Sequence, residues 1–472
     1  MTSWTPDLSQ GDGPLYLRLA NQIEADIGDG VLATGTKLPP QRDLAYDLGV
    51  TIGTVGRAYA LLRERGLVSG EVGRGTYVLD RAASQRTGLP ALDALPNQGT
   101  RVSETPADKL RFDSTAAPDV GQGAAIGRIL AEISSEHPGE ISSYARAFPH
   151  SWVEAGSQWL ARNGFRPGAE AVVPTLGAHA ALVAVAAVAT VPGDHIVFEN
   201  LSYSQFARSV GLFGRRVALV QSDDQGVVPE DFERLCAQRH PKLAFLMPAV
   251  QNPTVVSMPE TRRREIAEIA RRYNVWLIED DLYGAPVQDP TPLLAEFAPE
   301  RTFVVAGLSK TVAAGIRGGW VACPPHFAHR ISVAHKMATG GMPFLLAELC
   351  ARLVLSGEAA AIRARCLDEV NARLKLACTS LAGFDFRWRP NVPFLWLGLP
   401  EPWLAGTFKN AAAGEGVLVD DEDEFKAGRT DQVFHRIRVG ITTPRRREDV
   451  TTGLATIRRL LGSGGSSYDS YG

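Results

Sequence analysis

The apolar positions of the first 80 residues predict three short helices followed by two strands. One helix face recurs every four residues, at Leu15, Leu19, Ile23 and Ile27. A second helix is expected to begin at Pro40, a favourable first-turn residue, and a third after Thr51, whose hydroxyl suits a helix cap. Short strands are expected around 67–68 and 77–79, on either side of a turn at 72–75. This order predicts a helix–turn–helix unit with a β-wing.

From residue 111 onward, short apolar runs alternate with helical stretches. The runs are 196–198, 217–220, 243–247, 275–278 and 303–306. They are continuous rather than alternating, which is typical of strands buried on both faces. A helix is predicted over 260–272, and the arginine runs at 262–264 and 445–447 are expected on solvated helix faces. The pattern therefore predicts an α/β body with a mostly parallel sheet covered by helices.

The stretch between these two patterns has no sustained period. It is rich in Pro, Gly and small polar residues, which is typical of a linker. We therefore expect a helix–turn–helix unit over 1–80, a linker over 81–110, an α/β body over 111–462 and a flexible tail over 463–472.

Charge and composition narrow the function classes. The chain has 49 basic and 52 acidic residues, which excludes a globally basic nucleic-acid binder but not a local one. Residues 1–80 carry seven Lys or Arg against ten Asp or Glu. One copy alone would bind duplex weakly, because affinity comes largely from neutralised phosphates; two copies on a dimer would bind better.

Neither membrane nor metal chemistry is indicated. No apolar run is long enough for a membrane span, and the first residues do not form a secretory signal. The five Cys are odd in number and form no CxxC pair, so neither a disulfide framework nor a zinc site is expected. A reducing cytoplasm is the expected location.

Polar side chains follow three of the predicted strands, where ligands of parallel sheets gather. They are Asn252, Asp280, Tyr283, Ser309 and Lys310, with Arg317 shortly after. This set suits a lysine that forms an imine with an aldehyde cofactor. The carboxylate would keep a pyridine nitrogen protonated, the amide and phenol would hold a phenolic oxygen, and the guanidinium would hold a phosphate. Residues 175–179 open a small-residue helix whose free N–H groups suit the same phosphate.

Two stretches of the first unit carry a recognisable order of residues. L-P-P-Q-R-D-L-A-Y-D-L-G-V-T-I-G-T-V-G-R, and then G-R-G-T-Y-V, resemble the winged-helix domain of GntR-type bacterial regulators over residues 14–79. The resemblance implies DNA contacts by Arg42, Thr51, Thr54, Arg57, Gly73, Arg74 and Gly75. The family usually has Arg where this chain has Ile52.

The order and spacing of the polar residues in the body resemble the fold-type I, class I aminotransferases, which use pyridoxal 5′-phosphate (PLP). The resemblance implies that Lys310 forms the Schiff base, that Asp280 pairs with the pyridine nitrogen, and that Asn252 and Tyr283 hold the phenolic oxygen. It implies further contacts by Tyr203 on the ring and by Ala178, His179, Ser309, Arg317 and, from the other subunit, Tyr144 on the phosphate. Arg438 would clamp a ligand carboxylate, although a structural salt bridge is an equal alternative. Tyr203 and Tyr144 are also open to a role as ordinary core or interface aromatics. Two departures from the family pattern are Val255, where N-P-T-G is usual, and Gly307, where a hydroxyl is usual.

The combination of a GntR-type DNA-binding domain, called the reader below, with an aminotransferase-like body resembles the MocR-type transcriptional regulators. The resemblance implies operator DNA, a head-to-tail homodimer and PLP held on Lys310 as an aldimine, with an amino compound or PLP itself as the signal. Two alternatives stay open: a working aminotransferase with an accessory DNA-binding domain, and a body that only dimerises.

Overall fold

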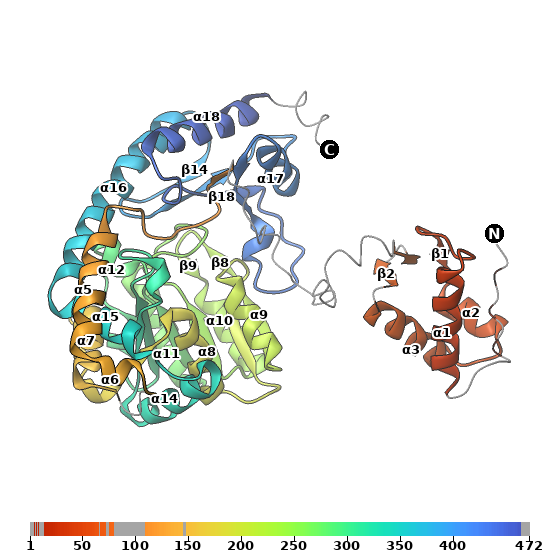
Figure 1. Cartoon of the computed structure of the whole chain (residues 1–472), viewed down its shortest axis with the longest axis horizontal. Coiled ribbons are helices and arrows are strands. Elements are labelled where there is room, and N and C mark those ends of the chain that lie inside the picture. The colour runs from red at the N-terminus through yellow and green to blue at the C-terminus, as the bar shows by residue number, and fades with distance from the viewer. Residues whose placement is uncertain are drawn as a thin grey trace. The chain divides into compact units, whose positions relative to one another are not determined.

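The computed structural model describes residues 4, 6, 8, 14–65, 67–71, 75–79, 109–144 and 148–463. Contacts divide the chain into two compact units, 1–98 and 99–472, which are described separately below (Figure 1).

The first unit is a winged helix. Its elements are α1 (Leu15–Gly28), β1 (Lys37–Leu38), α2 (Gln41–Asp47), α3 (Ile52–Glu64), β2 (Val68–Glu71) and β3 (Gly75–Val78). The three helices and the two later strands confirm the prediction, and the Thr51 hydroxyl caps α3 by accepting from the Thr54 N–H at 3.2 Å. The strand β1 was not predicted; it pairs with β3 to give the antiparallel order β1-β3-β2. The apolar face of α1 packs with α3 through Leu19, Ile23 and Val55, none of which is exposed.

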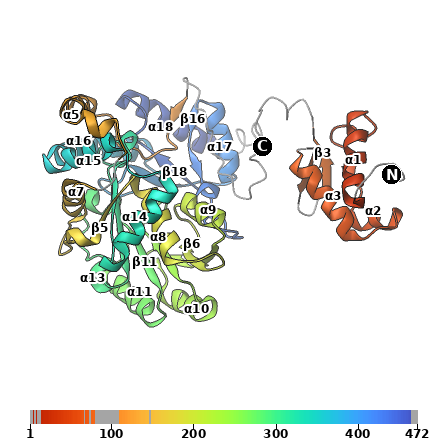
Figure 2. The same ribbon diagram turned by 60° about the horizontal axis from the view of Figure 1, so that its bottom comes forward.

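The second unit is built on a seven-stranded sheet with helices on both faces (Figure 2). Its strands, in spatial order, are β5 (Val172–Thr175), β13 (Gly319–Ala322), β12 (Thr302–Gly307), β11 (Trp276–Asp280), β10 (Leu243–Leu246), β6 (His195–Glu199) and β7 (Arg216–Val220). The five predicted strands are confirmed and are mutually parallel, whereas β13 runs antiparallel to both of its neighbours.

Alternate residues of the strands pack against different helices. Phe303 and Val305 of β12 lie in one apolar cluster with α8 (Gly177–Ala189), α9 (Ser204–Leu212) and α14 (Pro325–Thr339). Val304 and Ala306, on the other face of the sheet, lie in a second apolar cluster with α5 (Gln122–Glu136), α7 (His150–Leu160) and α15 (Phe344–Leu355). Farther along that same face, the sheet is covered by α10 (Pro229–Arg239), α11 (Glu260–Arg272) and α13 (Leu294–Phe297). The sheet is thus buried on both sides, which is why its strands are continuously apolar.

A smaller antiparallel sheet follows near the C-terminus. Its strands, in spatial order, are β14 (Phe386–Arg387), β15 (Phe394–Gly398), β18 (Arg436–Gly440) and β17 (Asp420–Asp421). It packs against α16 (Glu358–Ser380), α17 (Ala405–Gly414) and α18 (Arg447–Ser463) through one apolar cluster. The remaining elements are β4 (Leu110–Arg111), α6 (Pro138–Ile141), η2 (Ala169–Ala171), β8 (Ser222–Asp223), β9 (Gly226–Val227), α12 (Gly284–Val287), η3 (Ala314–Ile316), β16 (Val417–Leu418) and η4 (Glu422–Phe425).

Two sequence-based expectations are changed by the structure. Leu110, expected at the end of the linker, pairs with Val417 as part of β4 and so belongs to the second unit. Arg263 does not lie on a solvated helix face, because its side chain is fully buried and paired with Asp289 at 2.6 Å. Its neighbour Arg264 does face solvent, as expected.

The part of the chain that the structure describes holds neither a candidate membrane-spanning helix nor a candidate metal-binding cluster. In that part, no helix combines the length and apolar composition needed to cross a membrane. The same residues hold no group of three or more His, Cys, Asp or Glu side chains placed to bind a metal ion.

Candidate cofactor and ligand site

Three parallel strands deliver the predicted chemical groups to one edge of the large sheet. The strands β10, β11 and β12 are neighbours in register, with Leu246 opposite Glu279 and Asp280 opposite Val305. Their carboxyl ends therefore lie side by side. Asp280 is the last residue of β11, and the segments that leave β10 and β12 carry Asn252 and Lys310.

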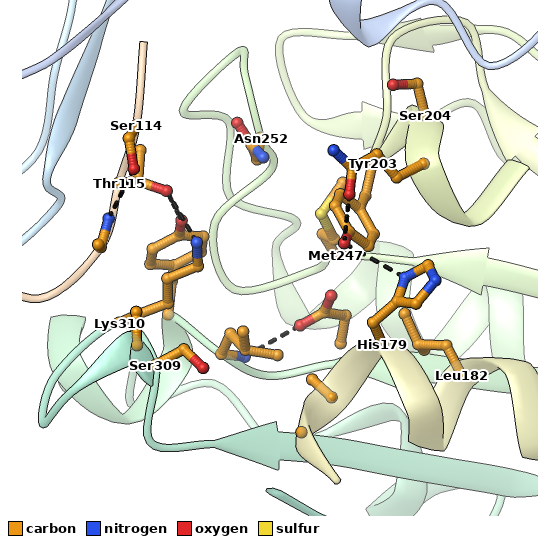
Figure 3. A pocket seen from close by; sticks show the side chains of 18 of the residues that line it. Ser114, Thr115, His179, Leu182, Tyr203, Ser204, Met247, Asn252, Ser309 and Lys310 are labelled. Atoms are coloured by element: carbon orange, nitrogen blue, oxygen red, sulfur yellow. Dashed lines mark hydrogen bonds between the residues drawn. The ribbon is translucent and has the colours of Figure 1, made fainter. Parts of the chain in front are cut away.

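These groups line one cavity of about 310 Å³, the size of a small-molecule site. The sequence-predicted residues on its wall are Ala178, His179, Tyr203, Asn252, Asp280, Tyr283, Ser309, Lys310, Arg317 and Arg438. Figure 3 shows Lys310 and Thr115 on one side of the cavity, Tyr203 and His179 on the other, and Asn252 between them. Tyr144 does not line this cavity; its side chain is 93% exposed.

The Lys310 amine contacts a hydroxyl pair. Its Nζ donates to Thr115 Oγ1 at 3.0 Å, and the same Oγ1 lies 3.0 Å from the Tyr283 hydroxyl. Burial raises the pKa of Tyr283 to about 12, so the phenol keeps its proton and remains a donor. Thr115 was missed in the sequence, because it lies 195 residues from Lys310 in a loop without a motif.

Asp280, the last residue of β11, carries a carboxyl group with a strongly shifted pKa. Burial raises that pKa to about 7, against the opposing effects of the Leu282 N–H, which donates to Oδ1 at 3.1 Å, and of the Lys310 charge. A cation placed against this carboxyl would favour its charged form. Asp280 is thus suited to pair with a protonated ring nitrogen.

The first turn of α8 offers free N–H groups to the cavity. Among the described residues, no side chain caps this 13-residue helix, and Ala178 and His179 of its first turn lie on the cavity wall. Glycines let neighbouring segments approach closely: a Cβ on Gly319 would lie 2.9 Å from the Ala178 nitrogen. The N-terminus of a helix, with Arg317 and Ser309 beside it, is suited to an anion such as phosphate.

The two departures from the family pattern have local explanations. Val255 has φ +65°, the left-handed conformation for which Gly is usual, at a cost of about 1–2 kcal/mol for a residue with a Cβ. The turn after Asn252 therefore holds a β-branched residue in a conformation that favours glycine. At Gly307, a Cβ would lie 2.9 Å from the Gly318 carbonyl oxygen, so the chain has no room there for the usual hydroxyl residue.

Tyr203 and His179 contact each other on the same side of the cavity. Their rings meet edge to face, 5.7 Å between centroids, and the Tyr203 hydroxyl lies 3.3 Å from His179 Nδ1. Ser209 Oγ lies 3.2 Å from His179 Nε2. Burial, together with the charge of Arg317, lowers the pKa of His179, so the imidazole is neutral near pH 7. These contacts hold the Tyr203 ring against the cavity.

Arg438 lies on the opposite part of the wall and already has protein partners. Its NH1 donates to Asn252 Oδ1 at 2.9 Å, and its NH2 forms an ion pair with Asp420 and donates to the Asp113 carbonyl oxygen at 3.3 Å. The bond to Asn252 turns the Nδ2 of that amide away from Arg438, where it can donate to a ligand. Asp420 was also missed in the sequence; it belongs to the acidic run 420–424, of which the structure buries four of the five residues.

Known proteins resemble this chain over nearly its whole length. Residues 15–78 match the bacterial regulatory proteins of the gntR family, and residues 138–384 match the class I and II aminotransferases. The uncharacterized HTH-type transcriptional regulator YdeF of Bacillus subtilis is 30% identical over 460 residues, 97% of each chain. The chain belongs to the MocR-type regulators of the GntR family.

A further relative and a solved structure also resemble this chain. The probable rhizopine catabolism regulatory protein MocR of Rhizobium meliloti is 26% identical over 337 residues, 67% of each chain. An archaeal alanine:glyoxylate aminotransferase aligns with a TM-score of 0.68 at 23% identity, covering 75% of this chain and 91% of that one. This MocR-type regulator therefore combines a GntR-type reader with a fold-type I aminotransferase body, as the sequence predicted.

The cofactor of the class I and II aminotransferase fold is PLP, and the cavity of this regulator fits it. The fit rests on an amine at Lys310, a carboxyl at Asp280 that a cation would ionise, and an uncapped helix end for the phosphate. The individual contacts of each residue with PLP remain predictions.

Some predicted DNA contacts lie within the described part of the winged helix. Arg42 on α2 and Arg57 on α3 are exposed, and Thr54 shares a 2.9 Å hydroxyl contact with Thr51 at the start of α3. Gly75 is the first residue of β3. Gly73 and Arg74 lie outside the described residues.

Buried carboxyls predict how the stability of this regulator depends on pH. Burial raises the pKa of Glu199 to about 7, of Glu279 to about 8 and of Asp280 to about 7. Between pH 6.5 and 8 the folded chain therefore holds protons that the unfolded chain has released. The free energy of unfolding of the PLP-free protein should fall as pH rises through this window. Chemical denaturation at pH 6.5, 7.25 and 8 measures the slope.

Glu279→Gln should flatten that slope, because Glu279 is fully buried and, within the described residues, its Oε1 has no hydrogen-bond partner. Glu268→Gln, an exposed change on α11, serves as the control. PLP should also flatten the slope by favouring the charged form of Asp280. If the free energy of unfolding rose with pH in this window, or if Glu279→Gln left its pH dependence unchanged, the raised pKa values of these carboxyls would be contradicted.

Proposed function

We propose that this chain binds operator DNA through its winged helix and senses an amino compound at PLP held on Lys310. The observation that supports this proposal is the convergence of Lys310, Asp280 and the uncapped end of α8 on one cavity, in a chain that also carries a DNA reader. Such a regulator would work in the cytoplasm.

When bound, PLP supplies an aldehyde carbon that bonds to primary amines and a ring that withdraws electrons. Lys310 would hold that carbon through Nζ, and Asp280 would accept from the ring nitrogen. Asn252 Nδ2 and the Tyr283 hydroxyl would donate to the phenolic oxygen. The Tyr203 ring would contact the cofactor ring, and the phosphate would be held by Ala178, His179, Ser309 and Arg317, with Tyr144 of a second copy.

An amine that took the place of Lys310 on PLP would release Nζ, and Thr115 offers that amine a hydrogen-bond partner. Thr115 Oγ1 lies 3.0 Å from Nζ, so the released amine would donate to that hydroxyl. A loop bound to Lys310 in one state and not in the other is the kind of difference that a ligand can bias. Because binding is reciprocal, an amine that changes DNA affinity must itself bind differently in the presence of DNA.

At the DNA, the exposed end of α3 lies in the major groove of one half-site, and each reader of a head-to-tail homodimer contacts one half-site. Thr51, Thr54 and Arg57 contribute from α3, Arg42 from α2, and Gly73, Arg74 and Gly75 from the wing. Residues 1–80 carry only seven Lys or Arg against ten Asp or Glu, so each reader should contact few phosphates, and DNA affinity should fall with salt on a shallow slope.

The test uses the PLP-loaded full chain and duplexes that it selects from a random pool. An amine that shifts the PLP absorbance should change the affinity for the selected duplex over the same concentration range. Arg57→Gln should weaken DNA binding about tenfold or more while leaving the absorbance shift intact. Arg65→Gln is the control, because Arg65 is paired with Glu24 rather than directed to a ligand.

Two other results would overturn the proposal. Sustained multiple turnover with a 2-oxoacid acceptor, with no change in DNA affinity, would make the chain a working aminotransferase with an accessory DNA-binding domain. Absence of a PLP absorbance band that borohydride fixes on Lys310 would leave the body as a dimerisation platform.

A further inference from the structure

Most hydrogen-bond donors of the Arg438 guanidinium already have partners within the protein. A guanidinium has two forks that can hold a carboxylate, one formed by NH1 and NH2 and one by Nε and NH2. NH2 belongs to both forks, and its two hydrogens are taken by Asp420 and by the Asp113 carbonyl oxygen at 3.3 Å. NH1 gives one hydrogen to Asn252 at 2.9 Å and keeps one. A ligand carboxylate therefore finds no complete fork.

The faces of the guanidinium are covered as well. Its carbon lies 4.7 Å from the centroid of the Phe425 ring and 5.6 Å from that of Phe394. Arg438 is 2% exposed, and its Nε is buried with no hydrogen-bond partner among the described residues. Among the described residues, one NH1 hydrogen and the buried Nε–H are left without a partner, and the two belong to different forks.

The position of Asp420 is set by strand register. Asp420 on β17 lies directly opposite Arg438 on β18, and its side chain is fully buried. The next residues anchor the same turn: Asp421 lies 3.5 Å from Lys409, and Glu422 accepts from the Phe434 N–H at 3.0 Å. Rotation of Asp420 into water would therefore require movement of the strand, so Asp420 is held behind Arg438, which itself lines the cavity.

A ligand carboxylate at Arg438 would share one positive charge with Asp420. Two carboxylates close together in a buried site repel each other, and one must move away or take up a proton. A neutral group such as an amide or a hydroxyl meets no such penalty and can accept the remaining NH1 hydrogen.

We propose that Asp420 is a specificity-determining residue that occupies the charge of Arg438, so that the cavity selects amines presenting an uncharged polar group, and not a carboxylate, to Arg438. This inference rests on the proposed function, since it concerns the amine that would displace Lys310. It is an alternative to the expectation that Arg438 clamps a ligand carboxylate, and one experiment separates the two.

The experiment titrates the PLP-loaded full chain with matched amines and follows the PLP absorbance. The pairs are L-alanine with L-alaninamide and 4-aminobutanoate with 4-aminobutanamide, which differ only in the charge of one end. The same ratios measured with free PLP in buffer correct for the different basicity of the amines. After this correction, the native protein should favour the amide of a pair by about tenfold or more.

Asp420→Asn should move the corrected ratio toward the acid by about tenfold or more, because Arg438 regains an unmatched charge. Asp423→Asn is the matched control, since Asp423 belongs to the same acidic run but is 62% exposed and paired with Lys426. If Asp420→Asn does not fold, the corrected ratio of the native protein alone decides whether the cavity prefers the amide or the acid.

The inference is overturned if the native protein prefers the acids. It is also overturned if the native protein responds equally to both members of each pair, or to neither. An unchanged ratio in folded Asp420→Asn does the same. A protein without a borohydride-fixed PLP label overturns the proposed function instead, so the two failures are distinguishable.

Discussion

Lys310→Ala is expected to yield a folded protein in which borohydride fixes no PLP to the chain. Only the Nζ of Lys310 places a primary amine beside Thr115 and Tyr283 on the cavity wall, among the residues that the structure describes. Without that amine the cofactor has no covalent link, and the remaining contacts hold it only reversibly. Absorbance of the purified protein and the mass of the borohydride-treated chain measure the loss.

Two further variants separate the causes of that loss. Lys310→Arg keeps a positive charge near Asp280 but cannot form the covalent link, so it should lose the label as completely as Lys310→Ala. Lys336→Ala removes an exposed lysine of the same unit and should keep the label in full. A borohydride label that persists on Lys310→Ala would place the cofactor on another lysine.

The large sheet and the chemistry at its edge could be predicted because their signals are local. Continuous apolar runs predicted five parallel strands, and the polar residues directly after them mark the edge where ligands bind. Lys310 was identified because it follows the predicted strand 303–306. The winged helix was predicted for the same reason, since its cap residue and helix periods lie close together in the sequence.

The parts that were missed depend on register between distant segments. Nothing near Asp420 in the sequence indicates that it lies opposite Arg438, because the pairing of β17 with β18 is set by the packing of the small sheet. The contact of Thr115 with Lys310 likewise joins a loop near the start of the body to a turn far along it. Charge patterning alone placed Arg263 in solvent, whereas its spacing from Ile266 and Ala270 puts all three on one helix face.

Arg263 stabilises the loop that carries Asn252. Its guanidinium pairs with Asp289 at 2.6 Å and donates to the carbonyl oxygens of Pro248 at 3.2 Å and Met258 at 2.9 Å, at the two ends of that loop. The side chain is fully buried, so every one of these partners loses a charged donor if it is removed. The loop in turn places Asn252 against the cavity.

Arg263→Ala should lower the free energy of unfolding by about 3–5 kcal/mol, because it leaves Asp289 and the loop carbonyls buried without their charged partner. Arg264→Ala, one residue along α11, removes an exposed arginine paired with Glu260 and should cost no more than about 0.5 kcal/mol. Chemical denaturation of the two variants against the native chain gives both numbers. Since the loop holds Asn252, Arg263→Ala should also weaken PLP binding under conditions where the chain remains folded, whereas Arg264→Ala should not. Equal effects of the two substitutions would mean that Arg263 is solvated, as its charge pattern had indicated, and that the loop is held by other contacts.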